Sequence, residues 1–442
     1  MGNLSDFSIN NGVLQKYTGK DEHVVIPDGV TKIGSNVFYF NSTLKSVVIP
    51  EGVTTIESEA FAFCKNLDDL YLPASLKKIT TQSFYSSHTN RLHLADISSW
   101  CNLEIEKDVF SFDNPISGAD LYVNGELIKD LVLPEGNYEV FEGAFSGCKS
   151  IETVTILDGP KFIYASAFAY CENLKKVTLS PSVAFIYFMA FYRCKNLKKI
   201  NLENVQSIGE ATFKECSSLE EINTSASPSE NAFAQCSNLK KATVGYVPPK
   251  CFYGCTNLES VVITKSDYTC IQPQAFDGCK NLKSIVLPED TTHICEHSFD
   301  GCKNLGNLNL HSLRYIRRCG FKGCKSMTEI DLSDVVNIDE GAFYDCSKLE
   351  NVVIPEGIKE INEGTFHGCT SLKSVTLPKS LKYIRFCAFE GCKSLKSIVI
   401  PDSVIEIGTK AFSGCSSLEE VVLPQKMPKI EKDTFEGCKF KI

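Results

Sequence analysis

The chain repeats one hydrophobic pattern about every 23 residues. Within residues 369–392, Val375 and Leu377 lie two apart and Pro378 follows them. This predicts a strand that shows both apolar side chains to one face and ends at the proline. Segment 381–384 predicts a second, shorter strand. A unit of this size cannot bury its apolar side alone, so the pattern indicates a solenoid in which each coil covers the next.

Each repeat closes with a phenylalanine followed three residues later by a small residue, most often cysteine. Ala388 and Cys392 are four apart, and Phe389 and Cys392 are three apart. That spacing predicts a short helical or 3-10 turn with its apolar side inward. Gly391 favours a tight corner directly before the cysteine.

The cysteines of this corner form a column of one residue per coil. Its members are Cys64, Cys148, Cys171, Cys194, Cys216, Cys236, Cys255, Cys279, Cys302, Cys324, Cys346, Cys369, Cys392, Cys415 and Cys438. Asn41, Ser87 and Asp113 take the same place in less regular repeats, which suits packing and not metal ligation. Stacked Cβ atoms that point in parallel also give poor disulfide geometry. We therefore interpret the column as buried, reduced thiols.

The whole pattern predicts a mainly parallel β-solenoid with one strand per coil, a second short strand, and short helical or 3-10 turns at the Phe-x-x-Cys corners. We expect an N-terminal cap segment at 1–22 and a single solenoid of about 18 coils over 23–442. Residues 88–147 are the least regular. Across 216–255 the coils are compressed, because neighbouring cysteines come closer together in the sequence.

Composition limits the function classes. The formal net charge of −9 carries no basic stripe, which argues against nucleic-acid binding. No stretch approaches 18 apolar residues, so no membrane span is predicted. Residues 1–18 lack the basic and apolar regions of a signal peptide. The protein is then either cytoplasmic, or secreted with its signal removed from this chain.

The repeat resembles the BspA-like leucine-rich repeat. The residues that carry this resemblance include Leu395, Ile398, Ile400-Pro401, Val404, Ile407, Ala411-Phe412 and Cys415. It covers about residues 23–442 and implies a leucine-rich repeat solenoid. Members of that family are mostly bacterial cell-surface or secreted proteins, associated with adhesion and host extracellular-matrix binding. The resemblance therefore favours a surface or secreted location, and a protein or host cell-surface ligand.

Two surfaces are candidate ligand sites. The outward position of the main strand is a row of threonine and asparagine, namely Thr155, Thr178, Asn201, Asn223 and Thr243. An extended partner could bind there, or the row could be a solvated sheet of β-favouring residues. Extra aromatic residues crowd two nearby coils, among them Tyr164, Tyr187 and Phe188. They predict either a contact site or local packing against the irregular 88–147 region.

Five zinc-type ligands fall in two or three adjacent coils: Cys270, His293, Cys295, His297 and Cys319. A chain with 21 cysteines also produces such groups by coincidence. We therefore expect no metal and no other cofactor, and keep these five as candidates.

The sequence has no glycine-rich phosphate loop and no nucleophile elbow, so we expect no enzyme. The predicted function is a non-enzymatic scaffold for protein–protein or cell-surface adhesion, as a bacterial surface or secreted protein in contact with a host. Two alternatives stay open. One is an intracellular or secreted scaffold that organises protein partners, and the other is a structural metal-binding repeat domain.

Overall fold

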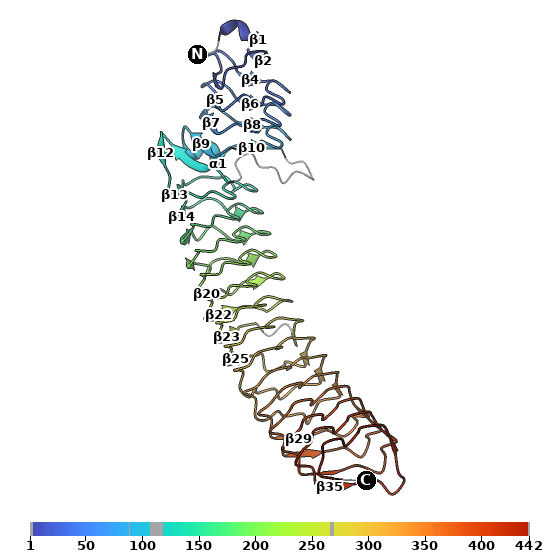
Figure 1. Cartoon of the computed structure of the whole chain (residues 1–442). Coiled ribbons are helices and arrows are strands. Elements are labelled where there is room, and N and C mark those ends of the chain that lie inside the picture. The colour runs from blue at the N-terminus through green and yellow to red at the C-terminus, as the bar shows by residue number, and fades with distance from the viewer. Residues whose placement is uncertain (1–2, 88, 107–117, 266–268, 441–442) are drawn as a thin grey trace. The chain divides into compact units, whose positions relative to one another are not determined.

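The computed structural model describes residues 3–87, 89–106, 118–265 and 269–440. The chain divides into two compact units, Met1–Leu219 (unit 1) and Glu220–Ile442 (unit 2). In each unit it winds as a parallel β-solenoid of the leucine-rich repeat type, and the described residues make up about 18 turns (Figure 1). Helix is confined, in these residues, to η1 (Leu4–Asp6) and α1 (Ile97–Cys101). The predicted fold class is confirmed.

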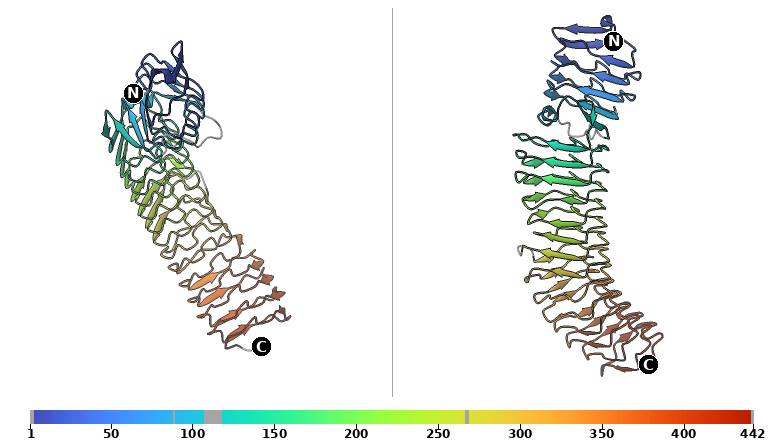
Figure 2. Two further views of the ribbon diagram at one scale, coloured as in Figure 1. Left: turned by 45° about the horizontal axis from the view of Figure 1, so that its top comes forward. Right: turned by 90° about the vertical axis from the view of Figure 1, so that its left-hand side faces the viewer.

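In unit 1 the longer strand of each coil belongs to a main sheet, which runs in two sections (Figure 2). The first contains β3 (His23–Val25), β5 (Ser46–Val48), β7 (Asp69–Leu72), β9 (Arg91–Leu94), β11 (Asp120–Val123) and the antiparallel β12 (Glu126–Leu127). The second contains β13 (Asp130–Leu133), β14 (Thr153–Ile156), β16 (Lys176–Leu179) and β18 (Lys199–Ile200). Along these strands buried and exposed side chains alternate, as the period of two requires.

The shorter strands of unit 1 form a second sheet, again in two sections. The first contains β1 (Phe7–Asn10), β2 (Val13–Tyr17), β4 (Lys32–Ile33), β6 (Thr55–Ile56), β8 (Lys78–Ile79) and β10 (Glu104–Ile105). The second contains β15 (Phe162–Ile163), β17 (Phe185–Ile186) and β19 (Ser207–Ile208). The hairpin of β1 and β2 lies on the first coil, where the Tyr17 ring packs 5.1 Å from Phe38.

Unit 2 repeats both strand types. Its main-sheet strands are β20 (Glu221–Asn223), β22 (Lys241–Val244), β23 (Ser260–Ile263), β25 (Ser284–Val286), β29 (Asn351–Val353), β31 (Ser374–Thr376), β33 (Ser397–Val399) and β35 (Glu420–Val422). Its shorter strands are β21 (Ser227–Pro228), β24 (Cys270–Ile271), β26 (His293–Ile294), β27 (Tyr315–Ile316), β28 (Asn337–Ile338), β30 (Glu360–Ile361), β32 (Tyr383–Ile384), β34 (Glu406–Ile407) and β36 (Lys429–Ile430).

A ladder of stacked phenylalanine rings forms the core of both units. Phe168 stacks on Phe191 at 5.3 Å in unit 1, and Phe343 stacks on Phe366 at 5.4 Å in unit 2. These four rings are fully buried. Burial of each ring contributes about 1.5–3 kcal/mol, and each stacked pair about 0.5–1.5 kcal/mol more. The ladder thus joins each coil to its neighbours.

The corner is a series of tight turns that does not continue into a helix. Alternate N–H groups donate three residues back within the coil, as Cys392 does to the Phe389 carbonyl at 3.2 Å. The others donate to the next coil, as Phe389 does to Ala411 at 2.8 Å. Because its N–H groups point alternately into the same coil and toward the next, the backbone adopts a left-handed conformation at two residues per coil, such as Cys387 and Gly391. We call these the first and second left-handed places.

The cysteine column acts as a ladder of hydrogen-bond donors. The Cys392 thiol donates to the Phe366 carbonyl of the preceding coil, with Sγ 3.3 Å from the oxygen. Ser87 does the same with its hydroxyl, whose Oγ lies 2.5 Å from the Phe61 carbonyl oxygen. A small buried donor therefore fills this place in the coils with cysteine or Ser87, whereas Asn41 is half-buried and accepts from the N–H groups of Thr43 and Leu44. Asp113 lies outside the described residues.

The irregular region contains the helix α1 between β9 and β10. Asp96 caps α1 by accepting a hydrogen bond from the Ser99 N–H at 2.7 Å. Trp100 is buried and packs edge-on against Phe141, with ring centres 5.2 Å apart. The helix thus supplies a large apolar side chain next to coils that lack the regular repeat.

Candidate functional site

The predicted threonine and asparagine row begins in unit 1. Thr155 and Thr178 lie side by side on β14 and β16, and both are half-buried. Asn201 follows β18, and its amide is already engaged with the backbone of Leu179. The Asn201 oxygen accepts from the Leu179 N–H and its NH₂ donates to the Leu179 carbonyl, both at 2.8 Å. The two threonine hydroxyls are therefore the more accessible polar groups here.

In unit 2 the row is short. Asn223 and Thr243 are neighbours on β20 and β22, with Asn223 exposed and Thr243 half-buried. The next residue in the same register is Val262. The structure thus places three of the predicted polar residues in unit 1 and two in unit 2.

The predicted aromatic residues of unit 1 do lie together. Tyr164 and Tyr187 stack with ring centres 5.2 Å apart, and the ring of Phe162 is 6.1 Å from that of Tyr187. Phe188 is half-exposed beside them in sequence. A hydrogen bond to Glu139 and burial raise the pKa of Tyr164 to about 12. This contact joins the aromatic group to the irregular region.

Two of the zinc-type candidates are direct neighbours. Cys270 and His293 pair across β24 and β26, and the His293 ring stacks on Tyr315 at 4.4 Å. Burial and Arg317 lower the pKa of His293. Burial raises the pKa of the half-buried Cys295 thiol to about 11, which favours the protonated form.

The other two zinc-type candidates occupy the first left-handed place in adjacent coils. His297 holds its Nδ1 3.0 Å from the Asp300 carboxylate, and Cys319 is half-buried. Across residues 3–87, 89–106, 118–265 and 269–440, no group of three or more histidine, cysteine or acidic side chains is placed to hold a metal ion.

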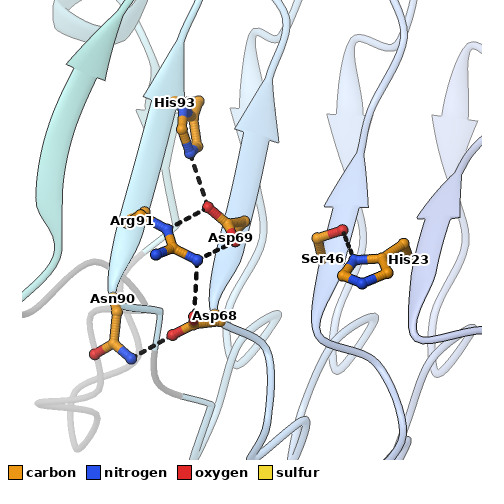
Figure 3. A network of polar contacts seen from close by, with 7 residues as sticks. All are labelled: His23, Ser46, Asp68, Asp69, Asn90, Arg91 and His93. Carbon is orange, nitrogen blue, oxygen red and sulfur yellow. Dashed lines mark hydrogen bonds and ion pairs between the residues drawn. The ribbon is translucent and has the colours of Figure 1, made fainter. Parts of the chain in front are cut away.

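A polar network on the main sheet of unit 1 was not predicted (Figure 3). Arg91 on β9 donates to both oxygens of Asp69 on β7, each at 2.6 Å, and to Asp68 at 2.9 Å. His93 places Nε2 3.0 Å from Asp69 as well, and Asn90 donates to Asp68. The Arg91 hydrogen bonds hold the pKa of Asp69 below its ordinary value. The network fixes the side chains of two adjacent strands.

Three rings stack on the same sheet face. His93 lies 3.9 Å from the Tyr71 ring and 4.7 Å from the Tyr122 ring. The alternation of Arg91, Leu92, His93 and Leu94 is enough to predict that His93 faces outward. That coil lacks the corner cysteine, which is the usual marker for aligning one coil with the next, so the sequence did not show that His93 lies beside Tyr71.

A second group missed by the sequence pattern lies at three corners of unit 1. It consists of Tyr39, Phe40, Phe63 and Tyr85, which we call the corner patch. Phe40 stacks on Phe63 at 4.3 Å, while Tyr39 and Tyr85 meet these rings edge-on at 4.8 and 5.2 Å. Phe40 is 57% exposed. The signal in the sequence is that Phe40 and Phe63 hold the place that glycine takes in repeats such as the one ending at Cys392.

Phe40 and Phe63 also have left-handed backbones, with φ of 56° and 59°. For a residue with a side chain this conformation costs about 1–2 kcal/mol. Their N–H groups donate to the carbonyls of Ala62 and Tyr85 in the next coil, so the stacking of coils enforces it. The chain therefore places the exposed Phe40 ring and the half-buried Phe63 ring at positions where the backbone is strained.

Comparison with known proteins identifies the repeat. The family model "BspA type leucine-rich repeat region (6 copies)" matches residues 8–121, 117–240, 245–347 and 336–442. No curated protein sequence matches the chain significantly. In the part of the chain that the structure describes, no helix has the length and apolar character needed to cross a membrane.

Several solved structures are similar to parts or most of the chain. A leucine-rich repeat protein from Bacteroides ovatus is 22% identical, with 97% of this chain and 81% of that one covered and a TM-score of 0.32. A leucine-rich cell surface protein from Faecalibacterium prausnitzii is 24% identical, with 96% and 92% covered and a TM-score of 0.30. The pneumococcal vaccine antigen PcpA is 17% identical, with 93% and 91% covered and a TM-score of 0.33.

Proposed function

Since this chain belongs to the BspA-type leucine-rich repeat family, we propose that it is a non-enzymatic adhesion scaffold that binds a protein ligand at a bacterial cell surface. Leucine-rich repeat families of this kind typically serve as binding scaffolds. A solenoid suits that use because it presents a long surface built on a rigid repeated backbone. The ligand in this proposal is a host matrix or cell-surface protein.

The corner patch is the observation that carries the proposal. Stacking of Phe40 on Phe63 offsets only part of the left-handed strain, about 0.5–1.5 kcal/mol. Glycine in place of Phe40 would remove both the strain at that residue and its exposed apolar surface. Exposed aromatic groups mark protein contact sites, where rings supply much of the binding energy. Binding of a partner would bury the Phe40 ring, which now stands mostly in water.

The other surfaces of unit 1 have supporting roles in this proposal. Thr155 and Thr178 can donate and accept hydrogen bonds with an extended partner. Tyr187 and Phe188 add half-exposed apolar area on the side of the shorter strands. In unit 2, the Asn223 amide and the Thr243 hydroxyl can also donate and accept hydrogen bonds. The corner patch is preferred because Phe40 is more exposed than Tyr187 or Phe188, at 57% against 40% and 39%, and belongs to a group of four contacting rings.

The test is an array of host matrix proteins and glycans, probed with the purified chain and with Phe40→Gly/Phe63→Gly. We expect binding to at least one matrix protein and a loss of about tenfold or more in the double variant. The thermal midpoint should stay the same or rise, because glycine relieves the left-handed strain. Full binding by the double variant, or no binding to any array member, would contradict the proposal.

Three controls accompany the double variant. Tyr170→Gly removes an exposed ring from the same left-handed place outside the corner patch, and should bind normally. Thr178→Ala/Asn201→Ala tests the main sheet, and Tyr187→Ala/Phe188→Ala tests the aromatic group. A larger loss in either of these two pairs would move the site to that surface.

One observation favours a second candidate, an intracellular scaffold for protein partners. Cys270, Cys295 and Cys319 are half-buried free thiols, and unpaired accessible thiols are more usual in reducing compartments. Fractionation of the producing cells, with detection by antibody, separates the two candidates. Recovery in the cytosol would support the intracellular scaffold, and recovery at the surface or in the medium would support the adhesion scaffold.

A further inference from the structure

A cavity of about 340 Å³ opens at the corners of several coils in unit 2. It exists because Gly341 and Gly364 hold the first left-handed place in two adjacent coils. The flanking coils carry Cys319 and Cys387 there. A Cβ added to Gly341 would stand 3.2 Å from the Cys319 sulfur, and one added to Gly364 would stand 3.5 Å from the Tyr344 ring. The row of first left-handed places is filled by side chains in the flanking coils, and the two glycines leave a hollow between them.

Aromatic rings line this hollow. Tyr344 and His367 stack with ring centres 4.3 Å apart and planes 12° apart. Phe386, which comes from the next coil, is 46% exposed. The His367 Nδ1 lies 3.4 Å from the Glu390 carboxylate, which orients the imidazole. The stacked rings thus give the cavity a fixed apolar wall.

Three carboxylates and two cationic side chains line the hollow, so its formal charge is negative and favours a cation. Glu340, Glu363 and Glu390 line it, with Arg318 and Lys410 contributed by the first and last of the lining coils. Arg318 lies 3.8 Å from Glu340, so that carboxylate is already paired. The exposed Glu363, among the described residues, makes no ion pair. It stands in one of the two glycine coils, directly before Gly364.

We propose that this cavity binds a cationic side chain of a protein partner, an arginine. A guanidinium is planar, stacks on aromatic rings and is attracted by their faces. It also pairs with a carboxylate through two hydrogen bonds, which Glu363 is free to accept. The volume lies in the range of small-molecule sites and holds one long side chain. This site lies in unit 2 and does not depend on the corner patch of unit 1.

The experiment titrates N-acetyl-arginine amide into the full chain and follows binding by calorimetry and NMR. For a probe of this size we expect a saturable Kd on the order of 1 mM. N-acetyl-citrulline amide has nearly the same shape without the charge, and should bind about tenfold more weakly. Equal binding of the two probes would overturn the proposal. Displacement of the arginine probe by methyl glucoside at similar concentration would also overturn it, in favour of a sugar site.

Variants locate the binding. Gly364→Gln fills the hollow and should abolish it, while the fold is kept because Gln274 has the same left-handed backbone at that place. Glu363→Gln should weaken binding about tenfold. Glu296→Gln is the matched control, since Glu296 is exposed and holds the place of Glu363 in a coil outside the cavity. Unchanged binding by both Gly364→Gln and Glu363→Gln would contradict the assignment.

Discussion

The two units share one corner backbone but differ in what stands at the second left-handed place. In unit 1 it holds a side chain in six described coils and glycine in one: Phe40, Phe63, Ser86, Tyr170, Arg193 and Glu215 against Gly147. In unit 2 it holds glycine in eight coils and a side chain in two: Gly254, Gly278, Gly301, Gly323, Gly368, Gly391, Gly414 and Gly437 against Gln235 and Asp345. The left-handed turn is therefore fixed by the bonds between coils, and glycine is optional.

In unit 1, contacts between side chains at the second left-handed place offset part of the backbone strain there. Arg193 lies over the Tyr170 ring at 5.9 Å and pairs with Glu215 at 2.7 Å, both across adjacent coils. Such contacts contribute about 0.2–1 kcal/mol each at the surface. In unit 2 a Cβ at Gly278 would meet the Gly254 backbone at an ordinary 3.7 Å, so space does not exclude side chains there. The corners are thus where the surfaces of the units diverge while their cores stay alike.

The largest expected effect tests whether the cores are alike. Phe61→Ala in unit 1 and Phe343→Ala in unit 2 each remove a fully buried ring from the ladder. Each should lower the free energy of unfolding by about 3–5 kcal/mol, measured in urea. Hydrogen exchange should show the loss in the coils next to the substitution. A loss below about 1 kcal/mol in one unit only would mean that the two ladders differ in rigidity.

The cysteine column gives the next effect. Cys346→Ala removes both packing and the thiol donor to the Phe321 carbonyl, and should cost about 2 kcal/mol. Cys346→Ser keeps a donor, as Ser87 does in unit 1, and should cost less. Urea unfolding of both variants measures the difference. If serine is as harmful as alanine, the hydrogen bond is not what the column supplies.

A smaller effect tests the difference between the corners directly. Gly323→Phe places in unit 2 the ring that unit 1 carries at Phe40. Because the place is left-handed and a Cβ there would meet the Gly301 backbone at an ordinary 3.5 Å, we expect a loss of about 1 kcal/mol, seen as a lower urea midpoint. Gly323→Ala is the control for backbone strain without the ring. An unchanged midpoint in both variants would show that the corner backbone adapts.

The repeat made the fold predictable, because one apolar period fixes the strand, the turn and the packing of coils together. The period also brings Thr155 beside Thr178, as expected from their equal spacing. It did not reveal that the Asn201 amide bonds to the Leu179 backbone, since that depends on where β18 ends. Nor did it predict the left-handed corners, which arise from hydrogen bonds between coils far apart in sequence.

The candidate sites were less predictable than the fold. His93 stands in a coil without the cysteine, so its place in the stacked rings needed the strand pairing. The cavity of unit 2 depends on the side chains that Gly341 and Gly364 lack, which a search for chemical groups does not find. Phe40 was visible in the sequence only as a ring where glycine is usual.

The smallest expected effect compares two aspartates whose pKa values move in opposite directions. In unit 1, Arg91 lowers the pKa of Asp69 below its ordinary 3.8. As the pH falls, the Asp69 carboxylate is protonated in the unfolded chain before it is protonated in the folded one. The ionised Asp69 therefore stabilises the fold fully above about pH 4, and this stabilisation is lost below it. Asp69→Asn should lower the urea midpoint at pH 7, and this deficit should shrink at pH 3.

In unit 2, burial and the nearby Asp300 raise the pKa of Asp277. Here the folded chain binds the proton more readily, so protonation stabilises it, and that contribution is lost as the pH rises through the raised pKa. Asp277→Asn imitates the protonated form and should raise the urea midpoint at pH 7, with little change at pH 3. The two variants should therefore differ in sign at neutral pH. If both lower the midpoint at pH 7, hydrogen bonding by the Asp277 carboxylate outweighs its burial, and the contrast between the units does not extend to their acidic groups.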